Sequence, residues 1–430
     1  MTYDKRKLFI VSLLALVTAG ISFALRASVG SDLQATFFNN SGELVGSALG
    51  VAGLGFALTI AIGSPMLDYL GMGNLLTLSS LCFIAGTLTV MFAGNIASGN
   101  TTQTIVWLGM LVTGVGWGLV ETVINPLTVT LYPDEKTARL NILHAWWPGG
   151  IIMGGLIGLG LGQLDMGWRA KLGVVLIPAT LTFLLCLTSK FPPTERMAAG
   201  LPASVMFQEV KKPFFFVWFF TMFLTAACEL APGQWVEIAL TRTVGMHGIW
   251  LLIYVSGLMF VMRHFAGPLV HKLSPAGLLW VSSLLAGLGL YSLSLANSPV
   301  TGLLAATLWG TGVCYMWPTM LAAASERFPR GGALLMGLMG TAGMISLNFV
   351  LPLLGQIYDN AKIQIAGGAD AFAKLSPAET ERVLGEAAQT SFRYVSAIPL
   401  ILLVVFGAIW MYDRSRGGYR AETIATSAGD

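Results

Sequence analysis

The chain has 430 residues, of which 55% are hydrophobic and 10% are charged, and its net charge is +3. Soluble domains carry about 25% charged residues, so this composition excludes an ordinary soluble protein and indicates a protein embedded in a lipid bilayer. The small net charge does not indicate nucleic acid as a partner. The four cysteines lie in apolar runs without the paired spacing of a disulfide framework or a metal site.

A membrane-spanning helix needs roughly 20 apolar residues, and runs of that length recur along the whole chain. In chain order they cover 8–29, 45–67, 74–94, 104–131, 139–162, 168–189, 213–240, 248–270, 276–296, 300–324, 332–357 and 392–412. The first run follows MTYDKRK directly and shows no small-residue cleavage site, so we expect a retained helix rather than a signal peptide. The sequence therefore predicts an all-α membrane protein with twelve transmembrane helices.

The segment 190–212 combines prolines with flanking charge and divides the spans six and six. We therefore expect an N-terminal six-helix half (1–189), a cytoplasmic linker (190–212), a C-terminal six-helix half (213–412) and a cytoplasmic tail (413–430). An N-terminus inside the cell puts most of the 24 Lys and Arg residues in cytoplasmic loops, among them Arg196 and Arg263. Both termini are then cytoplasmic. The polar segment 358–391 is external, with a surface helix capped by Ser376.

An internal repeat relates the two halves. It consists of a Trp-Gly pair, a proline and an acidic residue at constant spacing. It occurs as Trp117-Gly118, Pro126 and Asp134 in the fourth span and as Trp309-Gly310, Pro318 and Glu326 in the tenth. The repeat places Val313 opposite Glu121, so the intramembrane acidic residue of this pair of spans belongs to the N-terminal half alone.

Glu121 lies in the middle of the fourth span, about 15 Å by helical rise from the inner end at Leu131. Trp117, Glu121 and Asn125 are spaced i, i+4, i+8 and therefore share one helix face. An ionisable group at this depth is costly in hydrocarbon and marks a functional site more often than a structural one. Since burial disfavours the charged form of a carboxyl group, Glu121 can be neutral or charged near working pH, as a proton carrier requires. The alternative is a polar contact between helices.

The twelve helices in two related halves, with a Gly-x4-Asp-x2-Gly turn after the second, resemble the major facilitator superfamily over essentially the whole chain. The turn consists of Gly63, Asp68 and Gly71. The resemblance implies a substrate site near the midplane, between halves that rock to expose it alternately. It also implies a gating role for Asp68. The basic residues usual after this aspartate are missing, and Tyr69 stands there instead.

A closer resemblance covers about thirty residues. ETVINP at 121–126 and ARLNILHAWWPGG at 138–150 are similar to the fourth and fifth helices of the fucose:proton symporter family. The resemblance implies proton coupling and sugar binding for Glu121. It also brings Asn125 and Asn141 into the expected substrate site.

Four further residues of the N-terminal half are candidates. His144 and Trp147 stand where that family has a glutamine and an asparagine, and we expect both near the substrate. His144 titrates near neutral pH and could relay a proton, or it could be a hydrogen-bonded structural residue. Asp32 is the candidate for the family's first-helix aspartate and a second candidate for proton coupling. Arg26, deep in the first apolar run, either snorkels to the outer interface or binds substrate.

In the second half, CELAPGQWVE at 228–237 predicts a seventh span that is interrupted at Pro232-Gly233, as helices that line a cavity tolerate. Glu229 beside this break is a third candidate for proton coupling. An amide or carboxylate next to an aromatic ring suits a sugar. The side chains expected to face substrate from this half are Gln234, Trp235, Tyr315 and Trp317. The alternative for Trp235 is the outer interfacial belt of aromatic residues.

The sequence shows no nucleotide-binding loop, no His/Cys metal spacing and no nucleophile elbow, so we expect neither an enzyme nor a cofactor other than the coupling proton. The predicted function is secondary active transport, as a monomer in the plasma membrane, taken as a bacterial inner membrane. The protein would import a sugar or similar small polar solute with protons by alternating access. The alternative is proton-driven efflux of a small amphipathic compound, which would use the same fold and a similar buried carboxylate.

Overall fold

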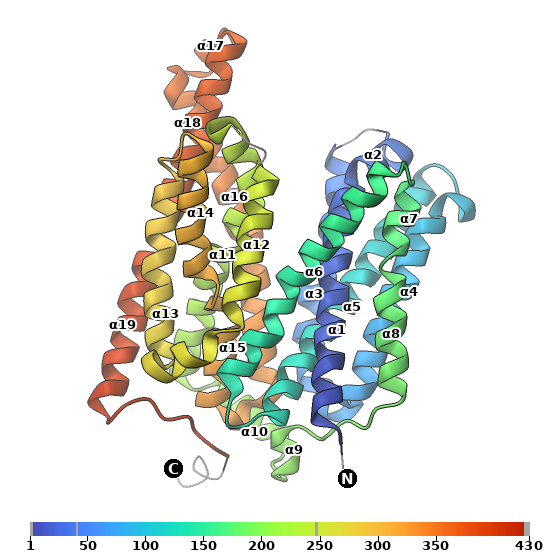
Figure 1. Ribbon diagram of the computed structural model, residues 1–430, viewed down its shortest axis with the longest axis vertical. Helices are drawn as coiled ribbons and strands as arrows, with labels where there is room; N and C mark the ends of the chain where they lie inside the picture. The colour runs from blue at the N-terminus through green and yellow to red at the C-terminus, as the bar shows by residue number, and fades with distance from the viewer. Residues whose placement is uncertain (1–2, 40–41, 246–247, 425–430) are drawn as a thin grey trace. The chain divides into compact units, whose positions relative to one another are not determined.

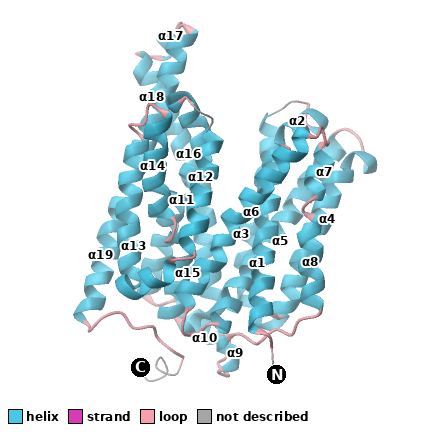
Figure 2. Ribbon diagram, viewed as in Figure 1, coloured by secondary structure: helices cyan, strands magenta, loops and turns pink. Residues whose placement is uncertain are grey.

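The computed structural model describes residues 3–39, 42–245 and 248–424, and within these ranges leaves out the side chains of 31, 34, 42, 43, 46, 234–243, 248, 249, 252, 348, 351 and 352. Helices and loops make up the whole of this described part (Figure 2). By contacts the chain forms two compact units. Unit 1 comprises Met1–Phe215, Ala324–Thr341 and Glu422–Asp430, and unit 2 comprises Phe216–Ala323 and Ala342–Ala421.

Unit 1 is built from the first ten helices and a short 3-10 turn, together with the ends of three helices that continue in unit 2. Its own elements are α1 (Lys5–Ser28), α2 (Gly30–Phe37), α3 (Gly42–Leu70), α4 (Met72–Ile96), α5 (Asn100–Leu131), α6 (Lys136–Gln163), α7 (Trp168–Gly173), α8 (Leu176–Leu187), α9 (Glu195–Ala198), α10 (Ser204–Val210) and η1 (Pro329–Gly331). The short helices α9 and α10 lie at the end of this unit from which α1 starts, and α2 and α7 lie at the opposite end (Figure 1).

Unit 2 contains the remaining helices. They are α11 (Pro213–Val244), α12 (Gly248–Arg263), α13 (Ala266–Leu293), α14 (Pro299–Val313), α15 (Met316–Arg327), α16 (Gly332–Ala366), α17 (Ala369–Phe372), α18 (Pro377–Val395) and α19 (Ile398–Ser415). The start of α11, the end of α15 and the start of α16 belong to unit 1. Ser376 and Glu379 form a capping box at the start of α18, so the surface helix expected after Ser376 is present.

Helices cover most of every predicted span, but several spans are interrupted or end elsewhere than predicted. Helix α16 continues to Ala366, beyond the predicted end at 357, and the predicted span 392–412 is divided between α18 and α19. By length and hydropathy, nine helical stretches of the described part could cross a membrane. The predicted span 248–270 ends early, because α12 stops at Arg263 and α13 begins at Ala266. Within α13 the backbone turns sharply at Ser274, whose φ is 65°, since the ring of Pro275 disfavours a helical conformation before it. The sixth span is divided into α7 and α8.

The predicted break in the seventh span is wrong, and a break occurs instead in the tenth. Helix α11 continues through Pro232, whereas Cys314 and Tyr315 form a turn that separates α14 from α15. Pro318 lies in the first turn of α15, where a missing N–H is tolerated. Because each proline leaves the carbonyl four residues earlier without its helical donor, both Cys228 and Cys314 need other partners.

Close helix crossings depend on glycines at a few positions. At Gly114, where α5 crosses α3, an added Cβ would lie 2.2 Å from the carbonyl oxygen of Ala52. At Gly20, where α1 crosses α6, an added Cβ would lie 2.7 Å from the carbonyl oxygen of Trp147. Small residues permit this backbone approach, which holds helices together in a bilayer by packing. These crossings bring α1, α5 and α6 together, and with them the candidate residues of unit 1.

Candidate functional site

Glu121 is the first of three buried polar side chains that are linked by hydrogen bonds. Asn125, one turn further along α5, donates from Nδ2 to Oε2 of Glu121 over 2.8 Å. The Oδ1 atom of Asn125 lies 2.8 Å from Nε2 of His144 on α6. An amide oxygen only accepts, so Nε2 of His144 donates this bond. Glu121, Asn125 and His144 are 6%, 3% and 3% exposed, and His144 Nε2 lies 4.0 Å from Glu121 Oε2.

These hydrogen bonds join α5 and α6 at the carboxyl group of Glu121. A polar side chain buried so far from water needs partners, and the three residues supply them to one another. When Glu121 is ionised, Asn125 donates to it. A histidine at 4.0 Å is close enough to respond to its charge. Glu121 therefore has polar neighbours both when its carboxyl group is protonated and when it is ionised.

Two indole rings stack beside these three side chains. The rings of Trp117 on α5 and Trp147 on α6 lie 4.6 Å apart with an angle of 8° between their planes. Phe56 packs on Trp117 at 4.5 Å, and Phe23 packs on Trp147 at 5.5 Å. Both indoles are only half-buried, and the stacked pair forms a flat apolar surface next to Glu121.

Arg26 on α1 contacts α5 at Thr113, one helical turn before Trp117. This side chain is 8% exposed and donates from Nη1 to the hydroxyl of Thr113 and from Nε to the carbonyl of Ser22, both over 3.3 Å. Thr113, Trp117 and Glu121 follow one another at intervals of four residues on the same helix face. Arg26 therefore lies at one end of a face whose other end is Glu121. Its burial disagrees with snorkelling to the interface.

Unit 2 holds a second buried charged group. Arg263, the last residue of α12, is 2% exposed and donates from Nη2 to Oε1 of Glu229 on α11 over 3.0 Å. It also donates from Nε to the carbonyl of Cys314 over 2.6 Å. That carbonyl is the one that Pro318 leaves without a helical donor. The ion pair therefore stabilises the break between α14 and α15.

The aromatic residues of the tenth span pack around this break. Tyr315 is buried and donates from its hydroxyl to the carbonyl of Met262 over 2.9 Å. Trp317 is half-buried and its ring lies against Gly343. Trp309 donates from Nε1 to the carbonyl of Cys228 over 3.0 Å, which satisfies the acceptor freed by Pro232. Of these residues, Trp317 alone keeps part of its side chain exposed.

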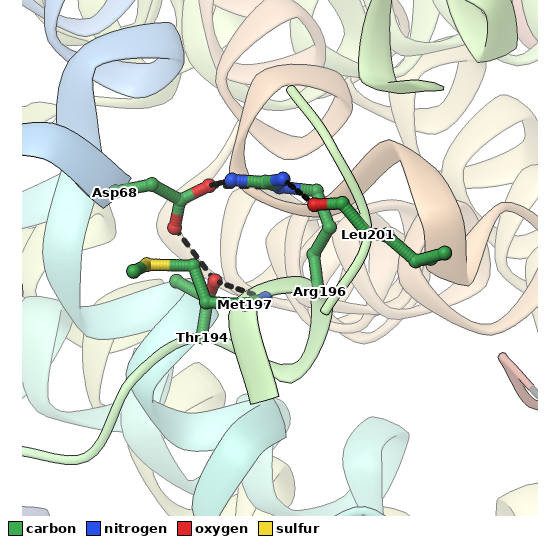
Figure 3. Close-up of polar contacts among 5 residues, drawn as sticks. All are labelled: Asp68, Thr194, Arg196, Met197 and Leu201. Atoms are coloured by element: carbon green, nitrogen blue, oxygen red, sulfur yellow. Dashed lines mark hydrogen bonds and ion pairs between the residues drawn. The ribbon is translucent and has the colours of Figure 1, made fainter. Parts of the chain in front are cut away.

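Asp68 receives its cation from the linker. Arg196 on α9 donates to Oδ2 of Asp68 from both Nε, over 2.9 Å, and Nη2, and it also donates to the carbonyl of Leu201 (Figure 3). Thr194 donates to Oδ1 of Asp68 over 2.6 Å and accepts from the backbone N–H of Met197, which makes it the N-cap of α9. The basic residues absent from the turn itself are thus replaced by one from a distant segment.

Two neighbouring contacts tie the same region to α6. Lys136 donates to Oε2 of Glu195 over 2.8 Å, and Thr137 donates to Oε1 of Glu326 over 2.7 Å. Beside them is a small pocket whose lining includes Thr130 and Arg196. None of the predicted substrate contacts lines this pocket, so it is not the predicted substrate site.

The remaining candidates are more scattered. Asn141 is fully buried and donates to the carbonyl of Thr137 in its own helix. Asp32 lies on α2 rather than α1 and is half-exposed, and in the described part no hydrogen bond or ion pair joins it to Glu121. The side chains of Gln234 and Trp235 lie outside the described residues.

The pairing of two basic residues is not visible in the sequence. Arg196 and Arg263, which we expect on the cytoplasmic side, are both buried, at 5% and 2% exposure, and each pairs with a carboxylate. Removing the partner of such a buried charge is strongly destabilising. For Arg263 the available signal was Glu229, an intramembrane carboxylate without an assigned partner.

Two units of apolar helices, each with ionisable groups buried along its helices, are typical of a polytopic membrane protein. The comparisons with known proteins agree. Residues 7–350 match the Major Facilitator Superfamily. The chain belongs to this family. Membership confirms the predicted fold class, an all-α membrane protein with twelve transmembrane helices in two six-helix halves.

Solved structures with this fold include two transporters that align with nearly the whole chain. The structure of FucP in the outward conformation has a TM-score of 0.72 at 14% identity and covers 93% of this chain and 98% of its own. FucP is the fucose:proton symporter of E. coli. The structure of the proton:xylose symporter XylE with 6-bromo-6-deoxy-D-glucose has a TM-score of 0.70 at 16% identity and covers 94% of this chain and 95% of its own. At such identities the likeness shows the fold alone.

A curated relative by sequence is myo-inositol transporter 1 of Candida albicans, which is 28% identical over 172 residues. The alignment covers 39% of this chain and 29% of the relative. The chain thus spans less than a third of that relative's length.

Proposed function

We propose that the protein is a secondary active transporter that moves a sugar or similar small polar solute into the cell together with protons, by alternating access. The observation that carries this proposal is the buried chain of Glu121, Asn125 and His144. A carboxyl group with a neutral amide and a titratable imidazole as neighbours can gain and lose a proton without breaking its surroundings. Coupling requires that proton occupancy and substrate occupancy affect each other. The stacked pair of Trp117 and Trp147 lies next to Glu121, which supports a substrate site beside the coupling carboxyl group.

The choice of solute is supported by the aromatic and polar residues together. Sugars and cyclitols offer hydroxyl groups for polar side chains and C–H faces for aromatic rings. The relatives by fold and by sequence transport fucose, xylose and myo-inositol. We propose the plasma membrane as the location, with both termini in the cytoplasm, and substrate contacts within unit 1 from Asn125 and Trp147.

The test is transport by the purified protein in proteoliposomes. The solutes are labelled fucose, xylose and myo-inositol, with carboxylated sugars tested beside them. Acidifying the outside should drive accumulation of at least one solute, and dissipating the pH gradient should abolish accumulation while leaving exchange intact. Extrusion of the solute against the proton gradient would instead support the efflux alternative.

Glu121→Gln separates coupling from binding. Glutamine keeps the size and hydrogen-bonding reach of a protonated glutamate but releases no proton, so counterflow of the solute should persist while accumulation fails. The matched control is Glu135→Gln, which removes a carboxylate that is 54% exposed and paired with Arg139 in its own helix. The control should retain both activities. If Glu121→Gln still concentrates solute under a pH gradient, Glu121 is not the coupling residue and Asp32 or Glu229 becomes the candidate.

A further inference from the structure

Arg26 is a buried cation whose partners among the described residues are all neutral. It is 8% exposed, and its two hydrogen bonds, to Thr113 and to the carbonyl of Ser22, are both 3.3 Å long. Such bonds usually measure about 2.7–3.2 Å. In the described part of the chain no carboxylate lies within ion-pair distance of Arg26. A guanidinium has five N–H donors, so most of its hydrogen-bonding capacity is unused.

Arg263, a second buried arginine of the apolar helices, has the charged partner that a buried guanidinium needs. Arg263 in unit 2 bonds Glu229 at 3.0 Å and the carbonyl of Cys314 at 2.6 Å. An uncompensated charge in the interior is strongly unfavourable, and proteins pair or ligate such charges. An unpaired arginine within a transmembrane helix therefore points to a counter-ion that arrives with the ligand.

Trp117 supplies a second unused donor near Arg26. Its indole Nε1 is buried and has no hydrogen-bond partner among the residues that the structure describes. The corresponding residue of the internal repeat, Trp309, donates from Nε1 to the carbonyl of Cys228. Buried N–H groups are nearly always satisfied. Trp117 is thus a donor without an acceptor, one helical turn from Thr113, which is the side-chain partner of Arg26.

These groups follow one another along a single face of α5. From Thr113 to Glu121 the helix rises about 12 Å, with Trp117 halfway and the ring of Trp147 stacked on it. The order is a cation, a donor on an aromatic surface, and then the coupling carboxyl group. This order fits a ligand with an anionic group at one end and hydroxyl groups along the rest.

We propose that Arg26 binds a carboxylate of the substrate, and that the transported solute is a sugar acid, such as a uronate or an aldonate, rather than a neutral sugar. This inference rests on the proposed transport function and narrows its substrate class. A carboxylate matches the planar guanidinium and balances its single charge. A phosphate monoester carries about −1.5 to −2 charges at neutral pH and would leave the excess unbalanced.

The test compares solutes that share a ring and differ in one group. Binding to the purified full-length protein is measured for glucose against glucuronate, galactose against galacturonate, and glucose 6-phosphate. Hydrogen bonds to charged groups are worth about 1.5–3 kcal/mol, so at least one acid should bind about tenfold or more tightly than its neutral partner. Equal or tighter binding of the neutral sugars would overturn the sugar-acid proposal and leave the transport function standing. Tightest binding of the phosphate would overturn the carboxylate assignment, and no binding by any solute would count against both.

Variants of Arg26 connect the preference to this residue. Arg26→Met should lower the affinity for the acid much more than the affinity for the neutral sugar and so remove the acid preference, while Arg26→Lys should keep a weaker preference because the charge remains. The control is Arg169→Met, since Arg169 is an exposed arginine that bonds the carbonyl of Met91. If Arg26→Met keeps the acid preference, the assignment is wrong.

A further variant keeps the test decisive if Arg26→Met does not fold. Trp117→Phe retains the ring and removes the unused N–H, so it should weaken acid and neutral sugar by a similar factor of several-fold. Its acid preference should stay that of the unmodified protein. An unchanged affinity for both solutes would show that this indole N–H takes no part in binding and would overturn the proposed site.

Discussion

Removing the cation that the linker supplies to Asp68 should destabilise unit 1 strongly. Arg196 and Asp68 have side chains that are 6% and 5% exposed and are joined by two hydrogen bonds from the guanidinium, one of them 2.9 Å long. Thr194 adds a third bond to the same carboxylate, at 2.6 Å. In Arg196→Met the carboxylate stays buried and keeps only the threonine. Breaking a buried pair in this way costs about 3–5 kcal/mol.

The double-mutant cycle separates this pair from general damage. Asp68→Asn should cost about as much as Arg196→Met, because it leaves the guanidinium buried with fewer charged partners. The double variant should lose less than the sum of the two, since neither charge is then left alone. The control is Arg382→Met, which breaks an i,i+4 pair with Glu386 whose side chains are 60% and 45% exposed. Exposed pairs of this kind are worth about 0.3–0.5 kcal/mol.

The measurement is denaturant unfolding of the purified protein in detergent, followed by helical circular dichroism. Arg196→Met should unfold at clearly lower denaturant than the unmodified protein, and Arg382→Met should be nearly indistinguishable from it. If Arg196→Met and Arg382→Met shift the transition equally, or if the losses of Arg196 and Asp68 simply add, the pair is not a buried coupled contact. The linker would then not replace the missing cations of the turn.

Three further outcomes can be checked by thermal unfolding or hydrogen exchange. Gly114→Ala should lower the free energy of unfolding by about 1–3 kcal/mol, because the added Cβ meets backbone atoms. Gly155→Ala should be neutral or slightly stabilising, because an added Cβ there has no atom within 4 Å. Equal effects of the two substitutions would contradict the close crossing at Gly114. Glu229→Gln should cost about 3–5 kcal/mol, and adding Arg263→Met should recover part of the loss; no recovery would argue against the buried pair. Ser376→Ala should cost about 1 kcal/mol and speed amide exchange in the first turn of α18, and unchanged exchange would contradict the capping box.

The sequence by itself determined the features that depend on local geometry. Membrane crossing follows from apolar length, so the spans could be located from the sequence, although ends such as that of α12 at Arg263 differ from the prediction. Asn125 lies four residues after Glu121, and helical spacing alone puts both on one face, where the structure shows their hydrogen bond. The capping box at Ser376 is likewise a pattern of four consecutive residues.

Proline positions could be read from the sequence, but their consequences could not. Pro232 and Pro318 each leave one carbonyl without a helical donor. The helix continues at Pro232 and breaks before Pro318. In both places a distant side chain, Trp309 or Arg263, bonds the freed carbonyl. The local pattern predicts the need for a donor and does not reveal which residue meets it.

Only the tertiary structure decided how the charges are paired. Arg196 and Asp68 are 128 residues apart, and Arg263 and Glu229 are 34 apart, so no helical or strand periodicity connects them. A charge in a loop and a charge in a buried pair look alike in a sequence, because their difference lies in the dielectric and the partner that folding supplies. The surroundings of Arg26 also depend on the tertiary structure. Its depth in the first apolar run can be read from the sequence, but the packing of the helices around it decides that no described carboxylate lies beside it.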